Sequence, residues 1–397
     1  MFAQIKKLLL GNGLAQGLQL GSLLVLSRIY APADFGLLAQ VQSVATLLAI
    51  AATLQLHLVV PLTSDEAQAR ACVVSVEFIC LALLCLAAVP ALLHGAHLPY
   101  AIVLAACIGL SNTYNGYLVY SGSFGQLSAF YVARAVIVIA FQLLLAAAHV
   151  PHGLVWAAIA GELCAALYLR QAKVGLKGLP VVNPAEAWSL ARKFRAFSVF
   201  GTLQELTSAS AFYAPLILFA TTFGKDVGGQ YAMTNRLVWA PVVLVSGSLA
   251  QVLYHRLGKN PPTSMKILLP PRQLLLSIGA VSALAGLSFL LERPTQWALG
   301  PQWALAGEFV PPMVISGCAF LMSIPFRVTC RVLHLQRLQL TLDVLLLASI
   351  YAVFASGATT PLQTMWILAA LSGAQAVLLS LIARFGMNEQ SAEGTSV

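Results

Sequence analysis

Residues 130–149 read FYVARAVIVIAFQLLLAAAH, a run of twenty amino acids in which Arg134 is the one Lys, Arg, Asp or Glu. An α-helix rises about 1.5 Å per residue, so twenty residues cross a hydrocarbon core about 30 Å thick. The whole chain has this character, since 59% of its 397 residues are hydrophobic, 9% are charged and the mean hydropathy is +0.85. A soluble domain carries about 25% charged residues. The sequence therefore predicts a protein of the lipid bilayer.

The composition also argues against several functions. The seven cysteines lie in apolar stretches without a CxxC pair, which argues against a disulfide framework and against a metal site. No phosphate-binding loop, nucleophile elbow or metal-spaced set of histidines is visible, so we expect no catalytic residues, no cofactor and no enzyme activity. The net charge of +9 does not by itself indicate a nucleic-acid partner, because in a membrane protein the positions of the basic residues carry the information.

The chain contains more stretches of the same kind as residues 130–149. A helix that spans the bilayer needs about twenty predominantly apolar residues, and we searched the whole sequence for such runs. Twelve are found, at roughly 8–28, 36–59, 72–93, 99–121, 130–149, 153–170, 196–221, 231–254, 272–291, 308–328, 338–355 and 362–383. The sequence therefore predicts an all-α polytopic membrane protein with about twelve transmembrane helices.

The basic residues predict how these helices are oriented. If the N-terminus is cytoplasmic, 18 of the 22 Lys and Arg residues, Arg134 among them, fall on the cytoplasmic side. The remaining four are Arg28, Lys225, Arg236 and Arg293. Cytoplasmic loops of membrane proteins carry an excess of Lys and Arg, so this asymmetry favours twelve spans with both termini in the cytoplasm.

The spans divide into two halves of six. We predict an N-terminal lobe over 1–175, a basic cytoplasmic linker over 176–195, a C-terminal lobe over 196–384 and a disordered cytoplasmic tail over 385–397. An even number of spans in each half makes the two halves run in the same direction, as in several transporter folds that bind their substrate between the lobes.

Two stretches resemble those of a known family. The first runs from Leu26 to Gly36 and reads LSRIYAPADFG, at the end of the first span. The second runs from Phe223 to Val252 and includes FG, GGQYAMTNR, a proline and QV. Together with the span count and the midpoint linker, they resemble the polysaccharide transporters of the MOP flippase superfamily, the Wzx-type flippases related to MATE transporters and lipid II flippases.

This resemblance implies a function. A flippase of this kind moves undecaprenyl-pyrophosphate-linked oligosaccharide repeat units from the cytoplasmic to the periplasmic leaflet of the bacterial inner membrane, for O-antigen or exopolysaccharide synthesis. It implies alternating access of two lobes around a cationic central cavity, with membrane lipids, a polysaccharide polymerase and glycosyltransferases as expected partners. The alternative is a MATE-like, cation-coupled antiporter of drugs or metabolites. A membrane-bound polymerase or ligase is disfavoured because the outer loops are short.

Arginines are the first candidates for substrate contacts, because a guanidinium binds phosphate oxygens in a bidentate manner. Arg28 and Arg236 match positions of the family pattern, and the alternative for both is extension of the side chain to the membrane interface. Arg134, Arg327 and Arg331 could gather substrate at the inner side, and the alternative for these three is placement by the positive-inside rule.

Amides and acids within the spans are the other candidates. Asn12, Gln16 and Gln19 share one helix face, and Asn112 and Asn115 form a second group. They could line a polar cavity and bind sugar hydroxyls, or they could bond neighbouring helices together. The acids inside the stretches are Glu77, Glu162, Glu205 and Asp343. Of these we select Glu205, then Glu162, as candidates for coupling to a proton or sodium ion; pairing with an arginine is the alternative.

Overall fold

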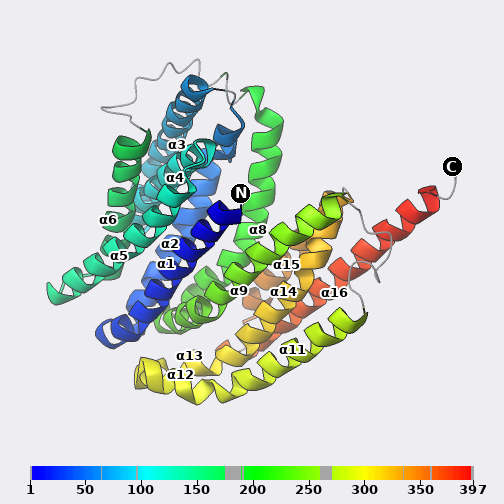
Figure 1. Cartoon of the computed structure of the whole chain (residues 1–397). Helices are drawn as coiled ribbons and strands as arrows, with labels where there is room; N and C mark the ends of the chain where they lie inside the picture. The colour runs from blue at the N-terminus through cyan, green and yellow to red at the C-terminus, as the bar shows by residue number, and fades with distance from the viewer. Residues whose placement is uncertain are drawn as a thin grey trace. The chain divides into compact units, whose positions relative to one another are not determined.

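A computed structural model describes residues 2–63, 65–94, 97–174, 189, 192–259, 271–333, 335–357 and 360–394 (Figure 1). Every regular element within these ranges is helical, which confirms the predicted all-α class. The chain divides into two compact units, Met1–Ile217 (unit 1) and Leu218–Val397 (unit 2).

Unit 1 is built around one central helix, α4. Of its neighbours, α2, α3 and α6 pack directly against α4, while α1 packs on α5 and α5 on α6. Short 3₁₀ turns η1 and η2 join α2 to α3, and a π-helical turn, η3, continues α6. The elements are α1 (Phe2–Ile29), α2 (Pro32–Thr53), η1 (Leu56–Leu58), η2 (Val60–Leu62), α3 (Glu66–His94), α4 (Leu98–Tyr120), α5 (Phe124–Ala147), α6 (Gly153–Tyr168), η3 (Leu169–Val174) and α8 (Arg195–Thr222), whose last residues belong to unit 2.

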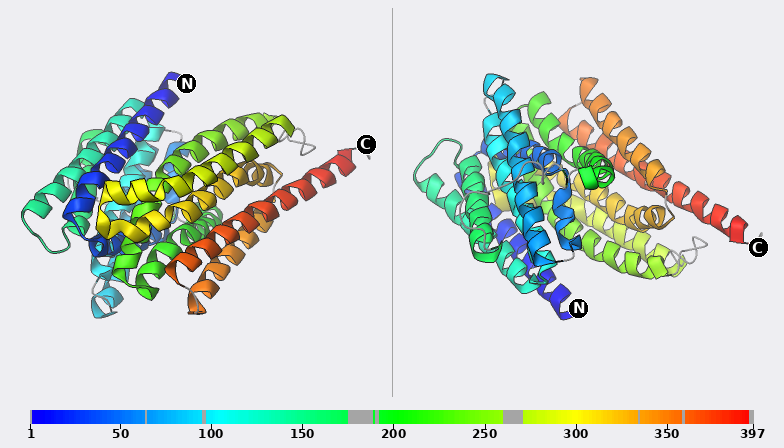
Figure 2. Two further views of the ribbon diagram at one scale, coloured as in Figure 1. Left: turned by 90° about the horizontal axis from the view of Figure 1, so that it is seen from below. Right: turned by 90° about the horizontal axis from the view of Figure 1, so that it is seen from above.

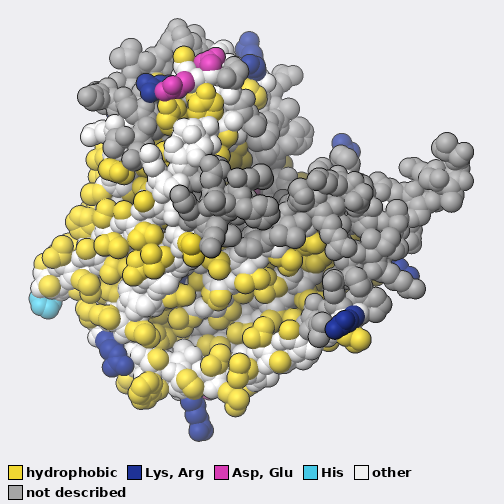
Figure 3. All heavy atoms as spheres, in the orientation of Figure 1, with side chains coloured by type: hydrophobic (Ala, Val, Ile, Leu, Met, Phe, Trp, Pro, Cys, Tyr) yellow, Lys and Arg dark blue, Asp and Glu magenta, His cyan; other side chains and the backbone are white. Residues whose placement is uncertain are grey.

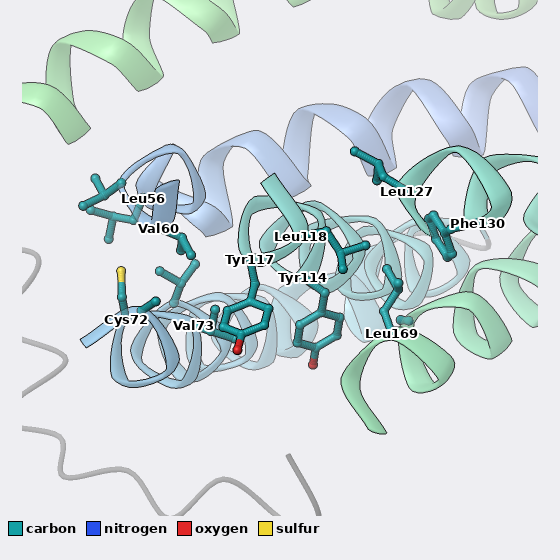
Figure 4. Packing of buried hydrophobic residues seen from close by; sticks show 14 of the residues in the cluster. Leu56, Val60, Cys72, Val73, Tyr114, Tyr117, Leu118, Leu127, Phe130 and Leu169 are labelled. Atoms are coloured by element: carbon teal, nitrogen blue, oxygen red, sulfur yellow. The ribbon is translucent and has the colours of Figure 1, made fainter. Parts of the chain in front are cut away.

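Two glycines let α4 occupy this central position. A Cβ atom on Gly109 would lie 2.8 Å from the sulfur of Cys80, and one on Gly116 would lie 2.7 Å from the carbonyl oxygen of His57. The aromatic rings of Tyr114 and Tyr117 then fill the core between α4 and its neighbours (Figure 4). Small residues at helix contacts allow the close backbone approach on which packing in a membrane depends.

Unit 2 is organised around α14, which packs against α9, α11 and α16. The helices α15 and α16 run side by side, as Figure 2 also shows. Between α11 and α14 the chain forms a group of short helical turns. The elements are α9 (Lys225–Lys259), α11 (Pro271–Leu290), α12 (Glu292–Leu299), η4 (Pro301–Trp303), α13 (Ala304–Glu308), α14 (Val310–Val332), α15 (Gln336–Ala355) and α16 (Pro361–Gly394).

The helix count agrees with the twelve apolar stretches. Twelve helices of sixteen residues or more occur in the described part of the chain. Eight of them are both long and apolar enough to cross a membrane, namely α2, α3, α4, α5, α6, α14, α15 and α16. On the face drawn in Figure 3, hydrophobic side chains cover much of the described surface, as expected for helices in contact with lipid. The side of the membrane that the termini face stays a prediction.

The predicted lobes, linker and tail stay predictions. The two compact units divide within α8, two residues after Pro215, and the predicted linker 176–195 lies mostly outside the described residues. Helix α16 extends past residue 385, where the tail was predicted to begin, as far as Gly394. Helix α5 begins at Phe124, six residues earlier than residue 130, so Arg134 lies well inside a helix and not at its start.

Candidate functional site

Three buried carboxylates are each bonded to an arginine of another element in the same unit. In unit 1, Glu162 pairs with Arg134, and Glu77 accepts from Nε of Arg170 at 2.9 Å. In unit 2, Asp343 accepts from Arg327 at 3.3 Å. Glu77, Arg170 and Asp343 were not among the candidates selected by sequence, because pairing depends on how each helix is rotated. The detectable signal was the position of the acids inside apolar stretches.

The pair of Arg134 and Glu162 lies near the middle of its helices. Arg134 is ten residues into α5, which is about 15 Å along the axis, and Glu162 is nine residues into α6. The two helices cross closely beside it, since a Cβ atom on Gly161 would collide with Val138. The Oε2 atom of Glu162 is buried without a hydrogen-bond partner. One carboxylate oxygen of the sequence candidate Glu162 is therefore bonded to an arginine, and the other has no hydrogen-bond partner among the described residues.

The pair of Arg170 and Glu77 is the most buried of the three, with 12% and 4% of the side chains exposed. Arg170 lies in the π-helical turn η3, and Glu77 lies eleven residues into α3. Tyr114 of α4 is buried next to them, and its hydroxyl oxygen is buried without a hydrogen-bond partner in the described part of the chain. This pair fastens the end of α6 to the core of unit 1.

The pair of Arg327 and Asp343 belongs to a wider polar network in unit 2. Gln375 of α16 donates to Oδ1 of Asp343 at 2.7 Å, the same oxygen that Arg327 of α14 contacts. Ser323 accepts from Nε of Arg327 at 3.2 Å, and the ring of Phe320 lies beneath the guanidinium, 5.8 Å from centroid to Cζ. The sequence candidate Arg327 thus joins three helices, α14, α15 and α16.

The other charged candidates lie apart from these pairs. Arg28 is exposed in the last turn of α1, and Arg236 is partly buried eleven residues into α9. Glu205 of α8 is exposed, with no ion-pair partner among the described residues. The side chain of Arg331 lies outside the described residues.

The amide candidates lie on helix faces with access to the surface of unit 1. Asn12 and Gln19 of α1 are exposed and Gln16 is partly buried, while α1 turns other residues toward α5. Asn112 of α4 is exposed, and Asn115 is partly buried with an Oδ1 atom that has no partner. No side-chain amide of these five bonds to another described residue, and their role stays a prediction.

The first family-like stretch forms the corner between α1 and α2. The hydroxyl of Tyr30 donates to the carbonyl oxygen of Gln142 in α5 at 2.8 Å, and Asp34 accepts from the backbone N–H of Ala31. Burial and the nearby Asp34 carboxylate raise the pKa of Tyr30, which keeps the hydroxyl protonated and able to donate. Phe35 is fully buried. These residues fix the corner to α5.

The second family-like stretch forms the corresponding corner between α8 and α9. Gly228 leaves no room for a Cβ atom against Ala220, and the ring of Tyr231 stacks on Phe219 at 4.5 Å. The amide of Gln230 donates to the carbonyl oxygen of Gln302 at 2.6 Å and accepts from the N–H of Ala306 at 2.9 Å. Most of the signature residues therefore build the fold.

His57 is a feature that sequence analysis did not select. It lies in η1, between the spans α2 and α3, and its Nδ1 atom is buried without a hydrogen-bond partner. Burial lowers the pKa of His57 to about 4, so the imidazole is neutral at physiological pH.

Comparisons with known proteins give matches at the level of structure. No family model matches the chain, and no curated protein matches it. Among solved structures, an inward-facing multidrug-resistance MATE transporter of the MOP superfamily aligns with a TM-score of 0.63 and 12% identity, covering 98% of this chain and 96% of the other. The chain therefore shares the fold of that solved structure.

Two further matches agree with this fold. A MOP-superfamily transporter from Pyrococcus furiosus, described as having a binding pocket of reverse polarity, aligns with a TM-score of 0.59 and 13% identity over 97% of this chain and 95% of that one. An outward-facing MATE transporter aligns with a TM-score of 0.57 and 12% identity over 98% and 96%. Identities of this size establish the fold alone, and the resemblance to polysaccharide flippases stays a prediction.

Proposed function

We propose that this protein is a membrane transporter that works by alternating access of two lobes, and that it catalyses no bond cleavage. The fold covers nearly the whole chain, and structures with this fold are described in both inward-facing and outward-facing conformations. A transporter of this type needs two lobes that move against each other around a substrate site.

The substrate that we propose is an undecaprenyl-pyrophosphate-linked oligosaccharide repeat unit, moved toward the periplasmic leaflet of a bacterial inner membrane. Arg28, Arg236, Arg327 and Arg331 would contact the pyrophosphate, while the amides of α1 and α4 would bond sugar hydroxyls. A polymerase and glycosyltransferases that make surface polysaccharide would be the partners.

One observation favours an anionic substrate over an organic cation. Each of the buried carboxylates Glu77, Glu162 and Asp343 has an arginine partner, so none offers an isolated negative charge. A transporter of organic cations needs such a charge in its path, because an isolated carboxylate in a low-dielectric site attracts cations strongly. Of the four acids inside the predicted spans, Glu205 is the one without an arginine partner among the described residues.

The alternative function, a cation-coupled antiporter of the MATE type, is favoured by one residue. Glu205 is exposed in the middle of α8 and has no ion-pair partner among the described residues. A carboxylate in such a place could carry a proton or a sodium ion. A Glu205→Gln variant that loses drug efflux would favour this alternative.

Gene deletion tests the flippase proposal. A strain without this protein should lose the surface polysaccharide and accumulate undecaprenyl-linked repeat units, and the wild-type gene should restore both. Normal glycan without accumulated intermediates, in a strain that has no second flippase, would contradict the proposal.

A further inference from the structure

The three arginine–carboxylate pairs differ in one respect, which is how far the arginine reaches the surface of its unit. Arg170 and Arg327 have 12% and 17% of their side chains exposed, whereas Arg134 has 34%. Glu162, its partner, is only 9% exposed. A guanidinium has five N–H donors, so Arg134 has donors for a second anion while its carboxylate lies beneath it.

Glu162 depends on Arg134 for its negative charge. Of the helices packed against α6, α4 brings Cys107 close to Glu162, α5 brings Arg134 with Tyr131 beside it, and α2 carries Asp34, in its first turn. The turn η3, which continues α6, carries Arg170 and Lys173, and Arg170 is bonded to Glu77. Among the described residues, Arg134 is the cation bonded to Glu162. If Arg134 turned to a different anion, Glu162 would be a buried carboxylate without a counter-charge, which is strongly unfavourable unless it binds a proton.

We propose that Arg134 is a binding residue for the pyrophosphate group of the substrate, and that Glu162 takes up one proton when Arg134 changes partner. Before binding, the pair carries one positive and one negative charge. After binding, the guanidinium holds a phosphate oxygen and Glu162 is a neutral carboxylic acid whose proton comes from water. This deepens the proposed function and depends on it, because the recognised group is the pyrophosphate of a lipid-linked substrate.

The exchange couples anion binding to pH. Because one proton enters with each pyrophosphate, the dissociation constant should rise as pH rises, by up to about tenfold per pH unit. The close crossing of α5 and α6 at Gly161 brings the two helices that carry this pair together.

The test uses purified full-length protein in detergent and farnesyl pyrophosphate as the probe, with inorganic pyrophosphate in a parallel arm to separate a lipid source from a free one. Binding is measured by calorimetry, and proton exchange by a pH dye in weak buffer. Wild type should take up close to one proton per bound farnesyl pyrophosphate. Arg134→Gln should weaken binding roughly tenfold to a hundredfold, the range for a hydrogen bond to a charged group.

Glu162→Gln separates the exchange from a merely structural role. Without the competing carboxylate, this variant should bind farnesyl pyrophosphate more tightly than wild type, with no proton uptake by the protein and no pH dependence beyond that of the probe itself. Glu77→Gln, in the more buried pair, is the matched control and should keep the wild-type proton uptake. If Glu77→Gln does not fold, infrared difference spectra replace it: a carboxylic-acid band should form on binding in wild type and be missing in Glu162→Gln.

The outcomes distinguish this inference from the proposed function. Equal binding by wild type and Arg134→Gln, binding without proton uptake, or no binding of either probe would each overturn the inference. Binding of inorganic pyrophosphate as tightly as the lipid would leave the exchange in place and point away from a lipid-linked substrate. Normal surface glycan in the deletion strain would contradict the flippase function, even where proton-coupled pyrophosphate binding is present.

Discussion

Replacing Arg170 by methionine should destabilise unit 1 strongly, because it leaves Glu77 buried without its partner. The side chains lie 2.9 Å apart, and at an effective dielectric constant of about 20 the attraction at this distance is about 6 kcal/mol. Protonation of Glu77 limits the loss, so we expect about 3–5 kcal/mol, the usual cost of removing one partner of a buried pair. For a unit of this size, that corresponds to a fall of roughly 6–20 °C in Tm.

The double variant Glu77→Met/Arg170→Met tests the reasoning itself. Removing both charges should restore most of the lost stability, because apolar side chains of similar volume replace a buried pair at little cost. Unfolding can be followed with a thiol-reactive dye, since Cys72, Cys80 and Cys107 of unit 1 are buried. A single variant as stable as wild type, or a double variant no more stable than the single one, would refute the account of this pair.

Three further predictions concern the corners and the turn between α2 and α3. Gly228→Val should separate α8 from α9 and lower Tm, and adding Ala220→Gly should recover part of the loss, which heating curves would show. Gln230→Leu should cost about 2–4 kcal/mol, because two hydrogen bonds to backbone are lost, and hydrogen exchange should rise in α13; unchanged protection would contradict this. Wild type should lose stability as pH falls from 6.5 to about 4, because the lowered pKa of His57 favours the neutral imidazole in the folded state. The His57→Asn variant should lose less stability over the same pH range. Equal losses of stability would count against the burial of the imidazole.

The fold could largely be predicted from the sequence, because a bilayer demands long apolar helices and the charges between them are few. The limits of the helices were harder to predict. Residues 121–129 contain serines, glycines and a glutamine, and the predicted span began only at residue 130. In the structure Ser128 lies against Gly11, so small polar side chains here pack α5 on α1 and belong to the helix. This extension placed Arg134 in the middle of a span.

The types of residue in the candidate site could be predicted from the sequence, but the pairs that they form could not. An acid inside an apolar stretch is visible in sequence, and all four of these acids lie within helices. Which arginine pairs with which acid depends on the rotation of each helix and on the positions where helices cross, such as Gly161. A single amino-acid sequence gives neither the rotation nor the crossing positions. For this reason Glu162, selected as an ion-coupling residue, was found bonded to Arg134, while Glu205 was found exposed.

Transport by the purified protein tests the central claim most directly. Full-length protein is reconstituted in liposomes that contain a fluorescent undecaprenyl-pyrophosphate oligosaccharide, and a membrane-impermeant quencher reports the fraction in the outer leaflet over time. We predict that the protein speeds exchange between the leaflets, that Arg236→Gln slows it, and that an organic cation is not moved. Exchange no faster than in protein-free liposomes, together with proton-driven or sodium-driven movement of an organic cation that depends on Glu205, would contradict the account.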